Sequence, residues 1–208
     1  FPVAVGAAYW LKMNDAVDAV LCFFGDGAAN QGTFHECLNM ASLWKLPVLF
    51  VCENNHYQIG TEIHRHSAVA EIHRRACAYA MDARSVDGMD VLAVHEATRD
   101  ALRHVRAGNG PFLLECETYR YRGHSMADPG SYRSALELEE LRARDPLETF
   151  RARALAADWI TQEAQQALDR EVDEVVRDAV AFAADSPAPE DLHHGVYHTP
   201  LDLYGGRP

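Results

Sequence analysis

Short apolar segments alternate with segments of helical periodicity, and this order is what most constrains the fold. The apolar segments have the length of buried strands and are bounded by turn residues; they are 19–24, 48–52, 83–86 and 112–118. The segments between them carry apolar residues at helical spacing; they are 30–44, 68–80 and 91–107. The resulting β-α-β-α-β-α-β order predicts an α/β fold, a parallel sheet flanked by helices on both faces.

The chain changes character after the last predicted strand. A long loop, 119–133, is rich in Tyr, Arg, Gly and His, and loops of this length are usually functional or mobile. Three helical patterns follow, at 136–144, 147–157 and 161–185. The last carries an apolar stripe that suits packing on the chain's own sheet or docking onto another subunit. We therefore expect an α/β domain over 1–133, which includes the loop, and a C-terminal helical arm and tail over 134–208.

Charge and hydropathy limit the partners of this chain. It has 31 acidic and 19 basic residues, which gives a formal net charge of −12. That excess of negative charge repels a polyphosphate backbone, so nucleic acid is not expected as a partner. No run of about 18 uncharged apolar residues occurs, so no membrane-spanning helix is expected. The chain begins Phe1-Pro2-Val3 without an initiator Met, which indicates that upstream residues of the same domain are missing.

Polar residues follow the first two predicted strands where each strand ends. Gly25-Asp26-Gly27 follows the first and Asn54-Asn55 the second. Consecutive parallel strands bring their carboxyl ends side by side, so Asp26 and Asn55 can converge. Magnesium prefers oxygen ligands, with phosphate oxygens completing its shell, and the carbonyl of Tyr57 can add a third protein ligand. Glycines beside Asp26 let the backbone approach a phosphate. The pattern predicts a metal and diphosphate site.

The paired motif resembles the thiamine-diphosphate-binding motif, and the likeness extends to other segments. Together they resemble the alpha subunit of the pyruvate dehydrogenase first component, a thiamine-diphosphate-dependent 2-oxoacid dehydrogenase; they are 25–32, 39–41, 43–47, 53–55, 86–90 and 119–130. The similarity covers most of 1–184, so this chain resembles an alpha subunit that lacks its N-terminal part. The resemblance implies a thiamine-diphosphate-binding fold, with thiamine diphosphate and magnesium as cofactors.

The resemblance also implies roles for individual residues. Three of them would hold magnesium, namely Asp26, Asn55 and, through its carbonyl, Tyr57. The backbone of Gly27 and Ala28 would contact the diphosphate. His124, in loop 119–133, would lie at the mouth of the active site as a catalytic residue and contact the phosphate end of the cofactor.

The activity implied by the resemblance is oxidative decarboxylation of pyruvate, the end product of glycolysis, with transfer of the acetyl group to a lipoyl group. The partners would be a beta subunit, in a heterotetramer, and the lipoyl domain of the acyltransferase component. In this family the beta subunit supplies the glutamate that activates the cofactor, so that residue is not sought in this chain. The location implied is the cytoplasm in a bacterium or the mitochondrial matrix in a eukaryote.

Two other functions remain open at the level of the sequence. The alpha subunit of an acetoin dehydrogenase or of a branched-chain 2-oxoacid dehydrogenase would use the same scaffold, although Gly25-Asp26-Gly27 and Gly123-His124-Ser125-Met126 favour the pyruvate type. A truncated, non-catalytic assembly fragment belongs to a different class, and the abrupt start at Phe1 suggests it. A nucleotide-dependent phosphotransfer domain is disfavoured, because the chain lacks a G-x-x-x-x-G-K-[ST] loop.

Overall fold

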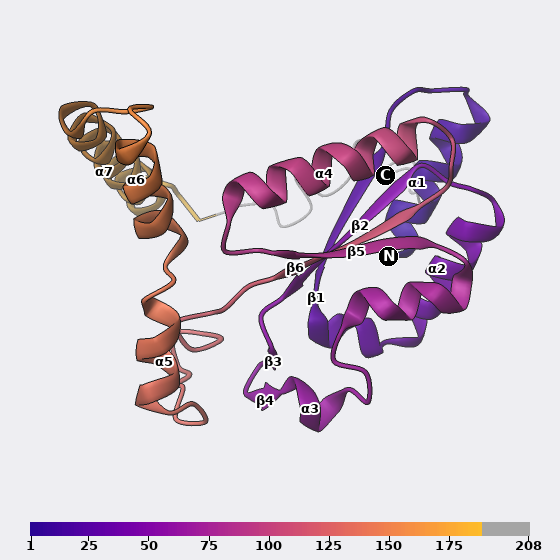
Figure 1. The fold of residues 1–208 in the computed structure, drawn as a ribbon, viewed down its shortest axis with the longest axis horizontal. Helices are drawn as coiled ribbons and strands as arrows, with labels where there is room; N and C mark the ends of the chain where they lie inside the picture. Colours follow the sequence, from indigo (N-terminus) through magenta and orange to yellow (C-terminus); the bar gives the residue numbers. More distant parts are fainter. Residues whose placement is uncertain (189–208) are drawn as a thin grey trace, which may run out of the picture. The chain divides into compact units, whose positions relative to one another are not determined.

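The computed structural model describes residues 1–188, and its centre is a four-stranded sheet (Figure 1). The strands are β1 (Val20–Gly25), β2 (Val48–Asn54), β5 (Asp82–Asp87) and β6 (Phe112–Glu117). They are ordered β1-β2-β6-β5, and every neighbouring pair is parallel. The predicted strands and the predicted parallel sheet are confirmed. All four carboxyl ends therefore lie along one edge of the sheet.

Helices cover both faces of the sheet, as predicted (Figure 1). One face packs against α1 (Pro2–Met13), α2 (Gly32–Leu43) and the 3₁₀ helix η2 (Ile72–Tyr79), and the other packs against α4 (Val91–Arg106). Alternate residues of β2 divide between the two cores, with Phe50 in the first and Leu49 in the second. Both side chains are fully buried. Because β2 is buried on both faces, its sequence is a continuous apolar run rather than an alternating one.

The local structure departs from the predictions at three places. Helix α1 was not predicted; it begins with Pro2 in its first turn, a position that proline favours, and it packs on the sheet. The helix predicted at 68–80 is limited to η2, whose first N–H groups bond to the Glu115 carboxylate rather than to a preceding turn. Between the predicted strand 48–52 and the predicted helix 68–80, the structure has two short strands and a short helix that were not predicted; they are β3 (Tyr57–Gln58), β4 (Thr61–Glu62) and α3 (Ile63–His66).

Three helices follow loop 119–133, in agreement with the sequence. They are α5 (Ala135–Arg142), α6 (Pro146–Ala156) and α7 (Gln162–Asp185). Side-chain oxygens cap α5 and α7, since Ser134 accepts from Glu137 N and Thr161 accepts from Ala164 N. The apolar stripe of α7 is exposed, and no residue of this helix is buried.

The chain forms two compact units, Phe1–Arg153 and Ala154–Pro208. The predicted division at residue 133 stays a prediction, because compactness and cofactor binding need not define the same boundary. The tail predicted at the end of 134–208 lies outside the described residues, which end at 188. Within residues 1–188, no helix is long and apolar enough to cross a membrane.

Candidate functional site

The ends of β1 and β2 lie side by side and begin the candidate site. Gly25 is paired with Glu53 in the parallel register, so the residues that follow each strand emerge together. Asp26 opens the short 3₁₀ helix η1 (Asp26–Asn30), and its side chain is 2% exposed. A Cβ on Gly27 would lie 2.6 Å from Gln58 Cγ. This close approach places the Asp26-Gly27 backbone against β3, the strand that follows Asn55.

The tight turn that follows β2 carries two candidate ligand oxygens, Asn55 Oδ1 and the carbonyl oxygen of Tyr57. Asn55 Oδ1 accepts a hydrogen bond from Tyr57 N at 3.2 Å, and Asn54 Oδ1 accepts one from His56 N at 3.1 Å. His56 has a φ of 65°, so the side chains of the two asparagines hold a left-handed residue in place. Arg120 Nη1 lies 3.5 Å from Asn55 Oδ1 and 3.4 Å from Tyr57 O. Asn55 Oδ1 and Tyr57 O therefore both face the Arg120 guanidinium.

The carboxylate of Asp26 is only partly satisfied. Its Oδ2 is buried and accepts no hydrogen bond in the described part of the chain, and His66 Nε2 lies 3.4 Å away. A buried carboxylate oxygen without a donor is costly, and a bound cation is one way to compensate it. Asn55 Oδ1 and the Tyr57 carbonyl on the neighbouring turn, which Arg120 contacts in this structure, are, like the Asp26 carboxylate, hard oxygen donors of the kind that Mg²⁺ prefers. The residues present therefore fit a magnesium ion.

The buried carboxylate of Glu115 forms hydrogen bonds with segments at this edge of the sheet. Glu115, in β6, is completely buried, and its two oxygens accept four hydrogen bonds. Oε1 accepts from Asn54 Nδ2 at 2.7 Å and from Ile72 N at 3.0 Å. Oε2 accepts from His73 N at 2.9 Å and from His73 Nδ1 at 2.6 Å. Glu115 thus joins the Asn54–Tyr57 turn to the start of η2 and fixes both.

Loop 119–133 has its own hydrogen-bond framework. Tyr57 and Tyr119 both donate to Glu137 Oε1, at 2.8 and 2.7 Å. Burial first, and then the bond to Glu137, raises the pKa of both tyrosine hydroxyls, so they remain protonated donors. His124 is exposed, and within residues 1–188 its side chain forms no hydrogen bond or ion pair with Asp26, Asn55 or Tyr57. The structure therefore brings Asp26 near the Asn55–Tyr57 turn but does not bring His124 into contact with them.

The sequence profile of the dehydrogenase E1 component family matches residues 1–191. The chain belongs to this family. The resemblance drawn from the motifs is thereby confirmed, and the loop 119–133 lies inside the matched segment.

Individual relatives from the E1 family agree. The chain is 46% identical over 189 residues to the pyruvate dehydrogenase E1 component subunit alpha of Rhizobium meliloti. The aligned segment covers 90% of this chain and 54% of the relative. The chain is 41% identical over 210 residues to the somatic, mitochondrial subunit alpha of Homo sapiens, which covers 98% and 53%. A chloroplastic subunit alpha-3 of Oryza sativa is 44% identical over 197 residues, which covers 90% and 46%. The chain spans about half the length of these relatives.

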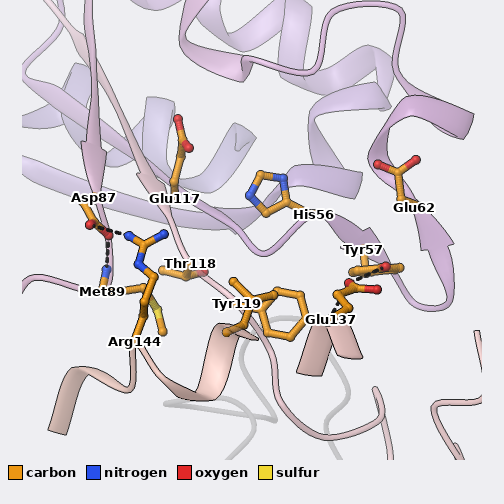
Figure 2. A pocket seen from close by; sticks show the side chains of 11 residues that line it. His56, Tyr57, Glu62, Asp87, Met89, Glu117, Thr118, Tyr119, Glu137 and Arg144 are labelled. Carbon is orange, nitrogen blue, oxygen red and sulfur yellow. Dashed lines mark hydrogen bonds and ion pairs between the residues drawn. The ribbon is translucent and has the colours of Figure 1, made fainter. Parts of the chain in front are cut away.

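A cavity of about 330 Å³ lies at the same edge of the sheet, and Tyr57 is the one metal-ligand candidate that lines it (Figure 2). Its lining does not include Asp26, Asn55 or His124. Four carboxylates line it, from Glu62, Asp87, Glu117 and Glu137. Its one arginine, Arg144, is paired with Asp87 at 2.8 Å. Because carboxylates outnumber free cations there, the cavity does not suit a diphosphate or a 2-oxoacid.

Asp128 organises the part of the E1 loop that carries His124. Its carboxylate accepts from His124 N at 2.7 Å and from Gly130 N at 2.8 Å. The His124 N–H first, and then the Gly130 N–H, lowers the pKa of Asp128 below its ordinary value. These bonds hold the loop backbone in a turn around a single carboxylate.

We expect the turn around Asp128 to open as the pH falls through the lowered pKa of this residue. A depressed folded-state pKa means that the stabilisation is complete above the ordinary aspartate pKa and disappears as the carboxylate protonates. A ¹³C NMR titration of the Asp128 carboxyl should give a midpoint below that of a free aspartate, and Asp128→Asn should speed amide exchange at His124 and Gly130 at neutral pH. A midpoint at the ordinary value, with unchanged exchange in Asp128→Asn, would contradict this expectation.

Sequence reasoning missed three residues around this site, and one of them had a detectable signal. They are His66, Glu115 and Arg75, whose guanidinium donates to Asn30 Oδ1 and Ser67 Oγ. Glu115 is a lone acid inside the apolar run 112–116, and a charge in a buried strand indicates a satisfied network. His66 and Arg75 carry no comparable signal, because their partners come from segments that only the fold brings close.

Proposed function

We propose that this chain is the cofactor-holding part of the alpha subunit of a thiamine-diphosphate-dependent pyruvate dehydrogenase (acetyl-transferring). The reaction is the oxidative decarboxylation of pyruvate with reductive acetylation of a lipoyl group. The observation that carries the proposal is the buried, unpartnered Asp26 Oδ2 beside the Asn55–Tyr57 turn, in a chain of the E1 family. Membership of that family supports thiamine diphosphate as the cofactor.

The proposed ligands of the cofactor come from two neighbouring loops. Asp26, Asn55 and the Tyr57 carbonyl would hold magnesium, because they offer one charged and two neutral oxygens. The backbone of Gly27 and Ala28 would contact the diphosphate, since no side chain caps the start of η1. When bound, thiamine diphosphate supplies a nucleophilic carbon and an electron sink for decarboxylation.

The chain's own residues have positioning tasks in this proposal. The ligand oxygens would hold magnesium, which would offset the negative charge of Asp26 and of the diphosphate. Glu115 and Asn54 hold the ligand turn in shape through their hydrogen bond. His124, on loop 119–133, would act as a catalytic residue at the mouth of the site. Its exposed side chain is free to approach a phosphate oxygen once the diphosphate is bound.

The partners and the location follow from the same proposal. A beta subunit would complete a heterotetramer and cover the other end of the cofactor, and a lipoyl domain of the acyltransferase component would accept the acetyl group. The cofactor-binding domain would comprise residues 1–133 and the helical arm would follow it. The cytoplasm of a bacterium or the mitochondrial matrix is the proposed location, and relatives of both origins support it.

Asp26→Asn tests the proposal most directly. We expect this substitution to lower the affinity for Mg²⁺ in the presence of thiamine diphosphate by about 10- to 100-fold or more, because it removes the one charged ligand and leaves the shape unchanged. Calorimetric titration of the protein in its native assembly measures this affinity. Asp15→Asn, an exposed aspartate in the turn after α1, is the matched control and should bind as the wild type does. Equal affinities for Asp26→Asn and the wild type would refute the proposed site.

A further inference from the structure

His66 faces the proposed metal ligand Asp26 in a buried position. The two side chains are 8% and 2% exposed, and His66 Nε2 lies 3.4 Å from Asp26 Oδ2. Both atoms are buried, and neither has a hydrogen-bond partner within residues 1–188, so this 3.4 Å approach is the polar contact that each makes there. Each is therefore the polar group available to satisfy the other.

We propose that His66 is a positioning residue for the metal site: its neutral imidazole presents Nε2–H to Asp26 Oδ2. This inference rests on the proposed function, since it assigns Asp26 as a metal ligand. Oδ2 has two lone pairs, so a donor on one of them fixes the rotation of the carboxylate and leaves the other lone pair for the cation. Partners of this kind orient a ligating group and raise the affinity for the metal.

The neighbouring hydrogen bonds determine which nitrogen of His66 carries the proton. An arginine only donates, so Arg75 Nη1, 2.9 Å from Asn30 Oδ1, fixes the orientation of the Asn30 amide. Asn30 Nδ2 is then the donor in its contacts with His66 Nδ1 and His66 O, both at 3.1 Å, and with Ser67 Oγ at 3.2 Å. Arg75 Nη2 also donates to Ser67 Oγ at 3.0 Å, and the Ser67 hydrogen then has two acceptors in reach, His66 Nδ1 at 2.9 Å and Asn30 Oδ1 at 3.5 Å, of which Nδ1 is the nearer.

The Asn30 amide nitrogen and the Ser67 hydroxyl thus both favour Nδ1 as an acceptor. The proton of a neutral imidazole then lies on Nε2, the nitrogen that faces the Asp26 carboxylate. The other tautomer would set a lone pair on Nε2 against the lone pairs of Oδ2, and a proton on Nδ1 against the Asn30 amide. Through Asn30 and Ser67, Arg75 therefore influences which nitrogen of His66 carries the hydrogen that faces Asp26.

The fold ties His66 to the ligand turn. Helix α3 begins directly after β4, and its Ile63 is 1% exposed, which anchors the helix in the core. Ile63 N donates to His56 O at 2.9 Å, so α3 is bonded to the turn that carries Asn55 and Tyr57. His66 thus reaches Asp26 from the segment that also supplies the other proposed ligands.

Two substitutions separate the Nε2 contact from the rest of the side chain. In His66→Gln the amide nitrogen takes the place of Nε2 and can still donate to Asp26. In His66→Asn the amide takes the place of Nδ1, so contacts with Asn30 and Ser67 remain but the donor to Asp26 is lost. His64→Asn is the matched control, because His64 lies in the same helix with its side chain 76% exposed.

The test measures Mn²⁺ binding, as a probe for Mg²⁺, by electron paramagnetic resonance of the native assembly with thiamine diphosphate. We expect His66→Asn to weaken Mn²⁺ binding by about 10- to 100-fold, His66→Gln to restore most of that loss, and His64→Asn to match the wild type. Wild-type affinity in His66→Asn, or an equal loss in both His66 variants, would overturn the inference. If Asp26→Asn also binds Mn²⁺ as the wild type does, the proposed function fails instead.

Discussion

Replacing Glu115 by alanine is expected to lower the free energy of unfolding by about 3–5 kcal/mol. The Glu115 side chain is completely buried and accepts four hydrogen bonds, from three residues. Alanine would leave the Asn54 amide and two backbone N–H groups buried without acceptors, and each such donor costs about 1–3 kcal/mol. Urea unfolding followed by circular dichroism measures the change.

Glu117→Ala is the matched control for Glu115→Ala. Glu117 ends the same strand but is exposed, and its hydrogen bond with Ser85 Oγ, 2.7 Å long, lies in solvent. We expect its loss to cost less than about 1 kcal/mol. Glu115→Gln should fall between the two, because the amide keeps one acceptor oxygen and turns an NH₂ toward two donors. A Glu115→Ala variant as stable as Glu117→Ala would show that the network adds nothing to stability.

The sheet was predictable from the sequence because burial on both faces leaves continuous apolar runs. Val48–Val51 is such a run, and each of its side chains is at most 6% exposed. The order of strands and helices then limited the sheet to a parallel one, and the topology placed Asp26 beside the Asn55 turn. Composition and order thus determine the edge on which the candidate site lies.

The supporting residues were not predictable because their partners are distant in the chain. Glu115 bonds to Asn54 and to the start of η2, which are 61 and 43 positions away. Asn30 and His66 are 36 positions apart. Periodicity reports which face a residue occupies but not which donor it meets there. Helix α1 was missed for another reason, since the upstream part of the chain was interpreted as a fragment of a domain rather than as a helix.

Arg133 closes loop 119–133 on itself. Its guanidinium is 5.3 Å from the ring centre of Tyr132, 5.6 Å from that of Tyr119 and 5.9 Å from that of Tyr57. Nη1 donates to Arg120 O, so the last residue of the loop is bonded to its beginning. The residue is 9% exposed. A buried cation surrounded by aromatic faces is stabilised both by these rings and by the carbonyl it bonds.

Arg133→Met is therefore expected to loosen the loop without unfolding the sheet. Methionine retains the apolar contact with the tyrosines but loses the charge and the hydrogen bond to Arg120 O, a loss of about 2–3 kcal/mol of local stability. Amide hydrogen exchange over 120–132 should become about 30- to 150-fold faster, whereas β2 and β6 should keep their protection. Arg122→Met, an exposed arginine in the same loop, controls for the change of charge and should leave exchange unchanged. If both variants exchange alike, Arg133 does not hold the loop. If Arg133→Met alone exchanges faster, the loop that carries His124 is held to the ligand turn by one buried side chain, since the same guanidinium lies over Tyr57.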